Sequence, residues 1–130
     1  CGPGRTTPIG TFRTPFKAAW HPLQGCWGQY CTQITGNYLF HSSPYNSPNK
    51  NDLSYRLYNQ LGTVCSHGCV RLTVADAKWI YDNCPLGTTV SIYNASSLPV
   101  PKPSAPWLDI SSPNRGWDPT DPDPANPWNK

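Results

Sequence analysis

Hydrophobic positions in the first third of the chain come in short runs separated by turn residues, which is the pattern of strands and loops. A short strand is predicted around Thr11–Arg13. Between Phe16 and Cys31 aromatic and turn residues mix without a helical period, so strands and loops are predicted there too. Ile34–His41 is predicted to be a hairpin, because Thr35-Gly36-Asn37 is a turn signal and Tyr38-Leu39-Phe40 follows as a buried strand.

The clearest helix is predicted after Leu72. Its start is marked by Thr73 and Asp76, whose side chains accept hydrogen bonds from the free N–H groups of a first helical turn. Its end is marked by Pro85 and Gly87. The residues that share one face at helical spacing are Ala77, Ile80, Tyr81 and Cys84.

The remaining segments carry weaker signals. Ser43–Asn51 is rich in Ser, Pro and Asn and is predicted to be an exposed loop, and Asp52–Leu61 is predicted to hold a short helical turn. Thr88–Tyr93 is predicted to be a β-branched strand. Beyond Ser96 repeated Asp-Pro steps favour extended backbone, so no regular element is expected. Tryptophans in this tail predict that it packs on the domain: Trp107, Trp117 and Trp128.

Composition supports one small, mainly β domain. Pro (16) and Gly (10) break helices, and 130 residues allow a single core. The net charge of +3 includes no Lys/Arg run, which argues against nucleic acid as a partner. Six cysteines without a methionine indicate an oxidising compartment, so we expect an exported, extracytoplasmic protein with a leader or anchor upstream.

Candidate chemistry concentrates in Cys65-Ser66-His67-Gly68-Cys69-Val70-Arg71, with a second histidine, His41, at the end of a predicted strand. A cysteine attacks as the thiolate and therefore needs a base, for which histidine is suited. Gly68 permits a tight turn that aims consecutive N–H groups at a developing oxyanion, and the helix that follows adds positive potential. These features indicate an acyl-transfer site built on Cys69.

Two other interpretations fit the same residues. Zinc is one, because four legitimate ligands are present: Cys65, His67, Cys69 and His41. A structural disulfide is the other. With Cys69 set aside, of three ways to pair four cysteines we favour Cys26 with Cys31 and Cys65 with Cys84, which leaves Cys1 for an upstream segment.

The sequence resembles the L,D-transpeptidase catalytic domain, also called the YkuD-type domain. The family's first hallmark is a His upstream of a Ser-His-Gly-Cys block, which is followed by a hydrophobic residue and Asn or Arg. In this sequence the His is His41 and the block is Ser66–Arg71. The second hallmark is a Thr-Pro-x-Gly-x-Phe segment, which is Thr7–Phe12 here. Phe40-His41-Ser42 and Ala75-Asp76-Ala77 with Gly87-Thr88 also match. The resemblance covers about residues 1–93.

This resemblance implies a β-sandwich with one short helix after a catalytic cysteine that lies in a tunnel beneath a loop flap. It implies that Cys69 attacks the L-centre carbonyl of the third residue in a donor peptidoglycan stem peptide and forms a thioester. An acceptor amine then resolves it into a 3→3 cross-link. The implied partners are stem peptides and carbapenem-type inhibitors, with no cofactor and no metal. Alternatives are an L,D-carboxypeptidase, with water as the acceptor, and a zinc-stabilised wall-binding module without catalysis.

The resemblance also assigns roles to single residues. His41 is expected to be the base, and Gly68 and Cys69 to supply oxyanion-hole N–H groups. His67 is expected to be catalytic or to shape the site. Substrate-binding residues are expected to be Arg71, Ser42, Ser66 and Tyr38, with Ser42 also orienting the His41 ring through its backbone. His21, beside Pro22, is expected to be an exposed loop residue.

Two departures from the family pattern are visible. The stretch between His41 and Ser66 is longer than usual, so Ser43–Thr63 is expected to form a lid or an extra wall. The family's first strands are missing before Thr7 and are expected upstream. We therefore divide the chain into a catalytic domain at 1–95 and a Pro/Asp/Trp-rich tail at 96–130 that packs on it. The tail aspartates lack the Gly and Glu of a calcium loop and are interpreted as structural.

Overall fold

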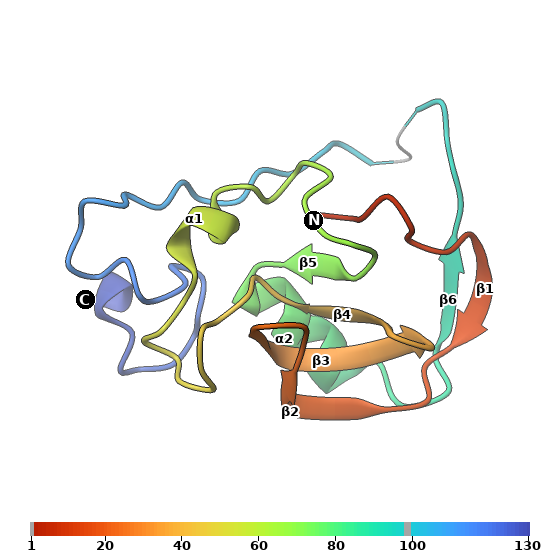
Figure 1. Ribbon diagram of the computed structural model, residues 1–130, viewed down its shortest axis with the longest axis horizontal. Helices are drawn as coiled ribbons and strands as arrows, with labels where there is room; N and C mark the ends of the chain where they lie inside the picture. Colours follow the sequence, from red (N-terminus) through yellow and green to blue (C-terminus); the bar gives the residue numbers. More distant parts are fainter. Residues whose placement is uncertain (1, 98–99) are drawn as a thin grey trace.

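The computed structural model of the protein describes residues 2–97 and 100–130 (Figure 1). The strands are β1 Gly10–Arg13, β2 Lys17–Pro22, β3 Trp27–Thr35, β4 Tyr38–Ser42, β5 Val70–Leu72 and β6 Thr89–Ile92. The helices are α1 Tyr55–Tyr58, α2 Val74–Asn83 and the 3₁₀ turn η1 Pro127–Asn129. Within the described ranges, no helix has the length and apolar character needed to cross a membrane.

The strands form two sheets. One has the order β2-β3-β4-β5, and the other pairs β1 with β6. The pairs β2–β3 and β3–β4 are antiparallel, whereas β4 and β5 run parallel. Helix α2 follows β5 and packs against β3 and β4 (Figure 1), whereas the connection between the parallel strands β4 and β5 contains α1. The predicted mainly β class with one short helix after Cys69 is confirmed.

Local signals in the sequence are borne out where a turn or cap defines them. The hairpin turns at Gly36 and Asn37, between β3 and β4. Helix α2 begins after Thr73, whose hydroxyl accepts a hydrogen bond from Asp76 N, and Cys84 is its C-terminal cap. The short helical turn expected in 52–61 is α1.

The main apolar core lies where the tail meets the 43–63 segment. Its fully buried residues come from that segment, from α2 and from the tail: Tyr45, Leu53, Tyr58, Val74 and Leu108. Tyr45, Leu53 and Tyr58 thus anchor the 43–63 segment in the core, while most of its other residues are partly or fully exposed. Of the two roles expected for this segment, a lid is wrong, and it forms a wall of the pocket described below only at Pro44.

Tail aspartates fix the start of α2. Asp118 is fully buried, and its carboxylate accepts from Val74 N at 3.0 Å and from Thr120 N at 2.8 Å. Because first-turn N–H groups have no partner within a helix, this carboxylate satisfies one of them and complements the helix dipole. Asp121 and Asp123 accept from the backbone two residues on in the same manner. These carboxylates therefore serve the tail's own turns.

The cysteine pairing expected from the sequence is wrong. Cys26, Cys31, Cys65 and Cys84 are all free thiols in the structure. Cys26 precedes β3 and Cys31 lies within it, and neither thiol is bonded to the other. Cys84 lies at the far end of α2, whereas Cys65 lies beside Gly2.

Candidate active site

Strand register brings the candidate residues to one face of the sheet. In the parallel β4–β5 pair, His41 is aligned with Arg71. Cys69 immediately precedes β5 and is two residues from Arg71. Side chains two residues apart on a strand point to the same face, so His41, Cys69 and Arg71 share a face. The sequence separation of 28 residues between His41 and Cys69 is thereby closed by a single strand pairing.

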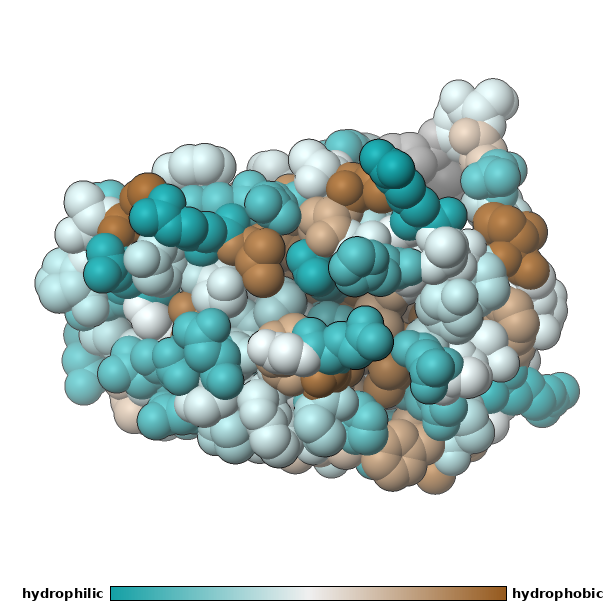
Figure 2. All heavy atoms as spheres, in the orientation of Figure 1, coloured by the Kyte–Doolittle hydropathy of each residue, from teal (hydrophilic) through white to brown (hydrophobic). Residues whose placement is uncertain are grey.

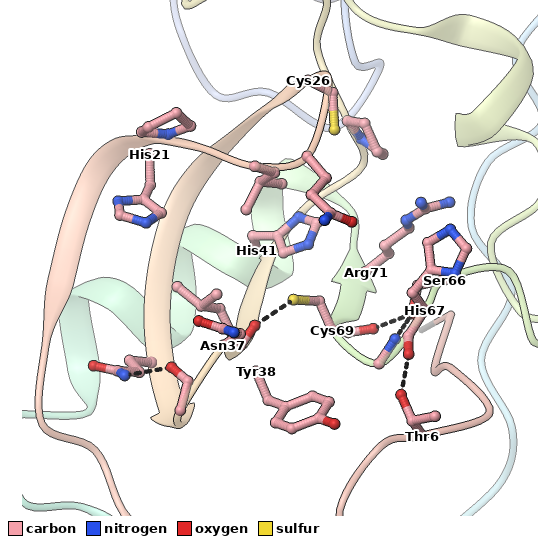
Figure 3. Close-up of a pocket in the computed structure, with 18 of the residues that line it drawn as sticks. Thr6, His21, Cys26, Asn37, Tyr38, His41, Ser66, His67, Cys69 and Arg71 are labelled. Atoms are coloured by element: carbon pink, nitrogen blue, oxygen red, sulfur yellow. Dashed lines mark hydrogen bonds between the residues drawn. The ribbon is translucent and has the colours of Figure 1, made fainter.

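That face opens into a pocket of about 710 Å³. Figure 3 shows His41, Cys69 and Arg71 directed into it from neighbouring strands, with Tyr38 below the cysteine. Its other walls come from the β2–β3 loop, the β3–β4 turn, the 66–69 loop and Thr6. Among its described lining residues Arg71 carries the only full charge, so the pocket favours an anionic group.

His41 is held as a neutral base. Its side chain is 2% exposed and its Nδ1 lies 2.5 Å from the Ser42 carbonyl oxygen. A carbonyl only accepts, so Nδ1 carries the proton and Nε2 keeps its lone pair. Burial lowers the pKa of His41 to about 4, opposed by the Ser42 hydrogen bond. Gly28 gives this ring room, because a Cβ there would lie 3.1 Å from His41 Cβ.

The pKa of His41 has a consequence for stability. An unfolded histidine takes a proton near pH 6.5, whereas folded His41 does so only near pH 4. Between these values the unfolded state binds more protons, so the free energy of unfolding should fall by about 3 kcal/mol as pH drops from 7 to 4. Chemical denaturation of wild type and His41→Gln across this range measures it. Other titrations are common to both proteins, so parallel pH curves would contradict the assignment.

Of the two roles expected for Ser42, the hydrogen bond from His41 Nδ1 to its carbonyl agrees with the orienting role, and the side chain does not agree with substrate binding. Ser42 is fully buried, and its hydroxyl accepts from Gln29 N and donates to Ser43 O, both at 2.9 Å. The side chain does not line the pocket, so binding of substrate by Ser42 is corrected to a positioning contact through its carbonyl. The sequence could not separate these two roles, because both place a serine after the histidine.

The Cys69 thiol rests in its neutral form. Its Sγ donates to the Asn37 carbonyl oxygen at 3.3 Å (Figure 3). Burial raises the pKa of Cys69 above its ordinary value, while a backbone hydrogen bond from Leu39 and the Arg71 charge act in the opposite direction. With His41 also neutral, the resting pair is thiol and imidazole rather than thiolate and imidazolium. Any attack by this thiol would therefore require transfer of its proton to a base.

The 66–69 loop is closed by Ser66. Its hydroxyl donates to Cys69 O at 2.5 Å and accepts from Gly68 N at 3.2 Å. The Gly68 N–H, expected to line the oxyanion hole, therefore already has an acceptor, and the Ser66 hydroxyl serves the loop rather than the substrate. The Cys69 N–H has no part in the hydrogen bonds recorded among the described residues and remains the better oxyanion donor.

The segment before β1 grips this loop. Thr6 and Thr7 donate their hydroxyls to the carbonyl oxygens of His67 and Gly68. Gly4 lies against Gly68, where a Cβ on Gly4 would come within 2.2 Å of Gly68 N. Thr7 was predicted only as part of the Thr7–Phe12 motif, and Thr6 was not predicted to have a role. The two threonines hold the carbonyls, which fixes the direction of the loop's N–H groups.

Gly68 is required because there is no room for a side chain. A Cβ there would lie 2.3 Å from the Tyr38 ring and 2.9 Å from Thr6 Oγ1. Gly68→Ala is expected to tilt the loop and slow acylation of Cys69 at least tenfold, since small displacements of reacting groups are costly. Adding Tyr38→Ala, which opens space, should recover part of the rate. Stopped-flow acylation by a carbapenem measures this, and an unimpaired single variant would contradict it.

The remaining candidates divide between rim and wall. His67 is exposed at the pocket rim, whereas Arg71 Nη1 donates to Cys65 O at 2.6 Å and its Nε is buried without a protein partner. His21 was expected in an exposed loop but lies in β2, half-buried against Phe16, and lines the pocket. A histidine before a proline gave no signal of this, because only the β2–β3 pairing turns it inward.

The residues proposed as zinc ligands do not form a cluster. In the part of the chain that the structure describes, no three His, Cys, Asp or Glu side chains converge in a way that could hold a metal ion. Cys65 Sγ lies against Gly2, and His67 is at the rim. Alternating spacing would put these side chains on one face of a strand, but residues 65–69 form a loop, and their side chains diverge.

Fold and site define a class: a small mainly β domain with a cysteine and a neutral histidine in one open pocket. The L,D-transpeptidase catalytic domain family matches residues 1–92, and the chain belongs to this family. A putative L,D-transpeptidase, YciB of Bacillus subtilis (strain 168), is 39% identical over 93 residues, which is 66% of this chain and 46% of that protein. The chain thus spans just under half the length of this relative.

Solved structures agree. A fused Zn-dependent amidase/peptidase/peptidoglycan-binding domain-containing protein from Clostridium acetobutylicum ATCC 824 has a TM-score of 0.53 and 36% identity, covering 72% of this chain and 38% of that one. The L,D-transpeptidase LdtMt1 in complex with imipenem has a TM-score of 0.52 and 22% identity, covering 71% and 46%. The second likeness is one of fold alone.

Proposed function

We propose that this domain is a peptidoglycan L,D-transpeptidase that forms 3→3 cross-links through a thioester on Cys69. The observation that carries the proposal is the Nδ1 contact from His41 to the Ser42 carbonyl, which leaves Nε2 free in the pocket that holds Cys69. In this tautomer the Nε2 lone pair is available to remove a proton from a group in the pocket. Membership of the L,D-transpeptidase family supplies the substrate class.

Acylation begins when Cys69 Sγ attacks the L-centre carbonyl of the third stem residue. The thiol proton passes to His41 Nε2, and negative charge develops on the carbonyl oxygen, where the Cys69 N–H is available as a donor. When the tetrahedral intermediate collapses, the bond to the terminal D-Ala breaks. The His41 imidazolium donates its proton to the nitrogen of the leaving D-Ala, which departs as a neutral amine, and the thioester on Cys69 remains.

Resolution reverses the order of proton transfers. The side-chain amine of a neighbouring stem attacks the thioester carbonyl and gives up a proton to His41. The Cys69 sulfur leaves and takes that proton back, which restores the neutral pair. The product is an amide between the third residues of two stems. If water attacks in place of the amine, the same steps give an L,D-carboxypeptidase.

Arg71 is proposed to bind a substrate carboxylate. It is the only full charge among the described residues of the pocket, and its buried Nε lacks a protein acceptor. Because an unpaired buried donor is costly, an incoming carboxylate gains both the charge and this hydrogen bond. Since stem peptides lie outside the cytoplasm, the proposal places the enzyme in the cell envelope.

The proposal is tested by incubating the protein with a disaccharide-tetrapeptide and analysing the products by mass spectrometry. Dimers cross-linked between third residues, absent with Cys69→Ala, are the expected result. Tripeptide without dimers would replace the transpeptidase by the carboxypeptidase. An unchanged tetrapeptide in the presence of folded, reduced protein would overturn both.

A further inference from the structure

A second pocket lies beside the segment that leads into the 66–69 loop. Its volume is about 550 Å³, and its walls come from three segments far apart in sequence: 58–63, the start of α2, and 102–107 of the tail. Thr63 lines this pocket and Ser66 lines the first. They are three positions apart in the sequence, and an extended chain of that length spans at most about 10 Å. The two pockets are therefore neighbours across one short stretch of chain.

Trp107 stands at this second pocket with its indole exposed. Its exposed fraction is 78%, which contradicts the expectation that the tail tryptophans pack. By contrast, Trp128 is half-buried and donates its indole N–H to Asn114 O and Trp117 O. The exposed apolar residues on the face seen in Figure 2 are scattered rather than gathered in one broad patch.

The backbone on either side of Trp107 is fixed. Tyr58 donates its hydroxyl to Pro106 O at 2.9 Å. Asn59 donates to Leu108 O at 2.8 Å and accepts from Leu108 N at 3.0 Å. These bonds anchor the residues immediately before and after Trp107. An exposed indole on an anchored backbone is a preorganised flat surface, which loses little freedom when a ligand stacks on it.

The polar groups around this indole have opposite charges. Asp76, in the first turn of α2, exposes its carboxylate, and Lys102 donates to Gly62 O at 3.1 Å while remaining exposed. Ser104 adds a hydroxyl to the lining. The pocket thus offers a flat aromatic surface, donors and acceptors, and no excess of either charge. A ligand that presents a flat C–H face together with hydroxyl and amide groups fits this chemistry better than an anionic peptide does.

We propose that this second pocket binds N-acetylated sugar residues of the peptidoglycan glycan strand, with one sugar ring stacked on Trp107. The inference rests on the proposed function, because a stem peptide held at Cys69 is attached to such a strand.

Binding is tested without catalysis. The Cys69→Ala protein is titrated with a peptide-free N-acetylglucosamine–N-acetylmuramic acid oligosaccharide and followed by NMR. Resonances of residues around Trp107 should shift, and Trp107→Ala should raise Kd about tenfold or more, as loss of one stacking platform does. The control is Trp79→Ala, because Trp79 is 62% exposed on α2 and does not line the pocket. Absence of binding, or equal loss with Trp79→Ala, overturns the proposal.

A kinetic arm separates sugar from peptide. With the Cys69-containing protein, Trp107→Ala should raise KM about tenfold for tetrapeptide stems carried on a glycan strand of several disaccharides, with kcat and the reaction of the free tetrapeptide unchanged. An equal loss on the free tetrapeptide would assign the pocket to peptide and overturn the proposal. Because the titration needs no acylation, a protein that binds the oligosaccharide yet never acylates refutes the enzymatic function alone.

Discussion

His41→Gln is expected to slow acylation of Cys69 at neutral pH by about 10²–10⁴-fold, the range associated with loss of a general base. The reason is the neutral resting pair: burial raises the pKa of Cys69 and lowers that of His41 to about 4, so no thiolate stands ready. Glutamine retains a polar side chain of similar length but takes no proton. The single-turnover rate with a carbapenem measures the effect.

The pH dependence provides the control for His41. Wild type should keep its rate down to about pH 5 and lose it as His41 takes a proton near pH 4. His41→Gln should lack this acid limb and should regain rate in alkaline solution, where hydroxide removes the thiol proton. A variant with the wild-type rate and profile would show that His41 is not the base. Loss of rate at every pH would assign His41 to positioning alone.

Leu108→Ala is expected to lower the free energy of unfolding by about 3 kcal/mol, within the range for a buried leucine. Leu108 is 1% exposed and packs in the core cluster with Tyr45, Leu53, Tyr58 and Val74. Truncation leaves a cavity at the point where tail, α1 segment and α2 meet. Urea denaturation followed by circular dichroism measures the change.

Leu86→Ala is the matched control for Leu108. Leu86 is 58% exposed, so the same truncation there should change stability by less than about 0.5 kcal/mol. Equal stabilities for the two variants would mean that the tail is not part of the cooperative folding unit. Residues 1–95 would then unfold independently of the tail, which would contradict the packing of Leu108 in the core.

Local chemistry explains which elements the sequence predicted. The turn at Gly36 and the cap at Thr73 depend on residues within three or four positions, so both appear in the sequence as they do in the structure. The burial of the 43–63 segment was not predicted, because its Ser, Pro and Asn residues indicate an exposed loop, whereas Tyr45 and Leu53 are buried in the core cluster with the tail residue Leu108. Long-range burial leaves no local signal when polar residues surround the buried ones.

The candidate site divides in the same way. His41 and Cys69 were singled out by their chemistry and by resemblance, and the β4–β5 register accounts for their proximity. What could not be foreseen is which hydrogen-bonding groups are already in use. Ser42 and Gly68 have the right positions, but Gln29 N and Ser66 Oγ occupy their hydrogen-bonding capacity. Such competition is visible only once the chain is folded.

The most direct test of the account is the intact mass of the reduced protein after incubation with a carbapenem, compared between wild type and Cys69→Ala. We expect one adduct per wild-type molecule and none on the variant, because Cys69 lines the same pocket as the neutral His41 and its own N–H is free to bind the oxyanion. An adduct that persists in Cys69→Ala, or no adduct on folded wild type, would contradict the assignment of Cys69 as the nucleophile.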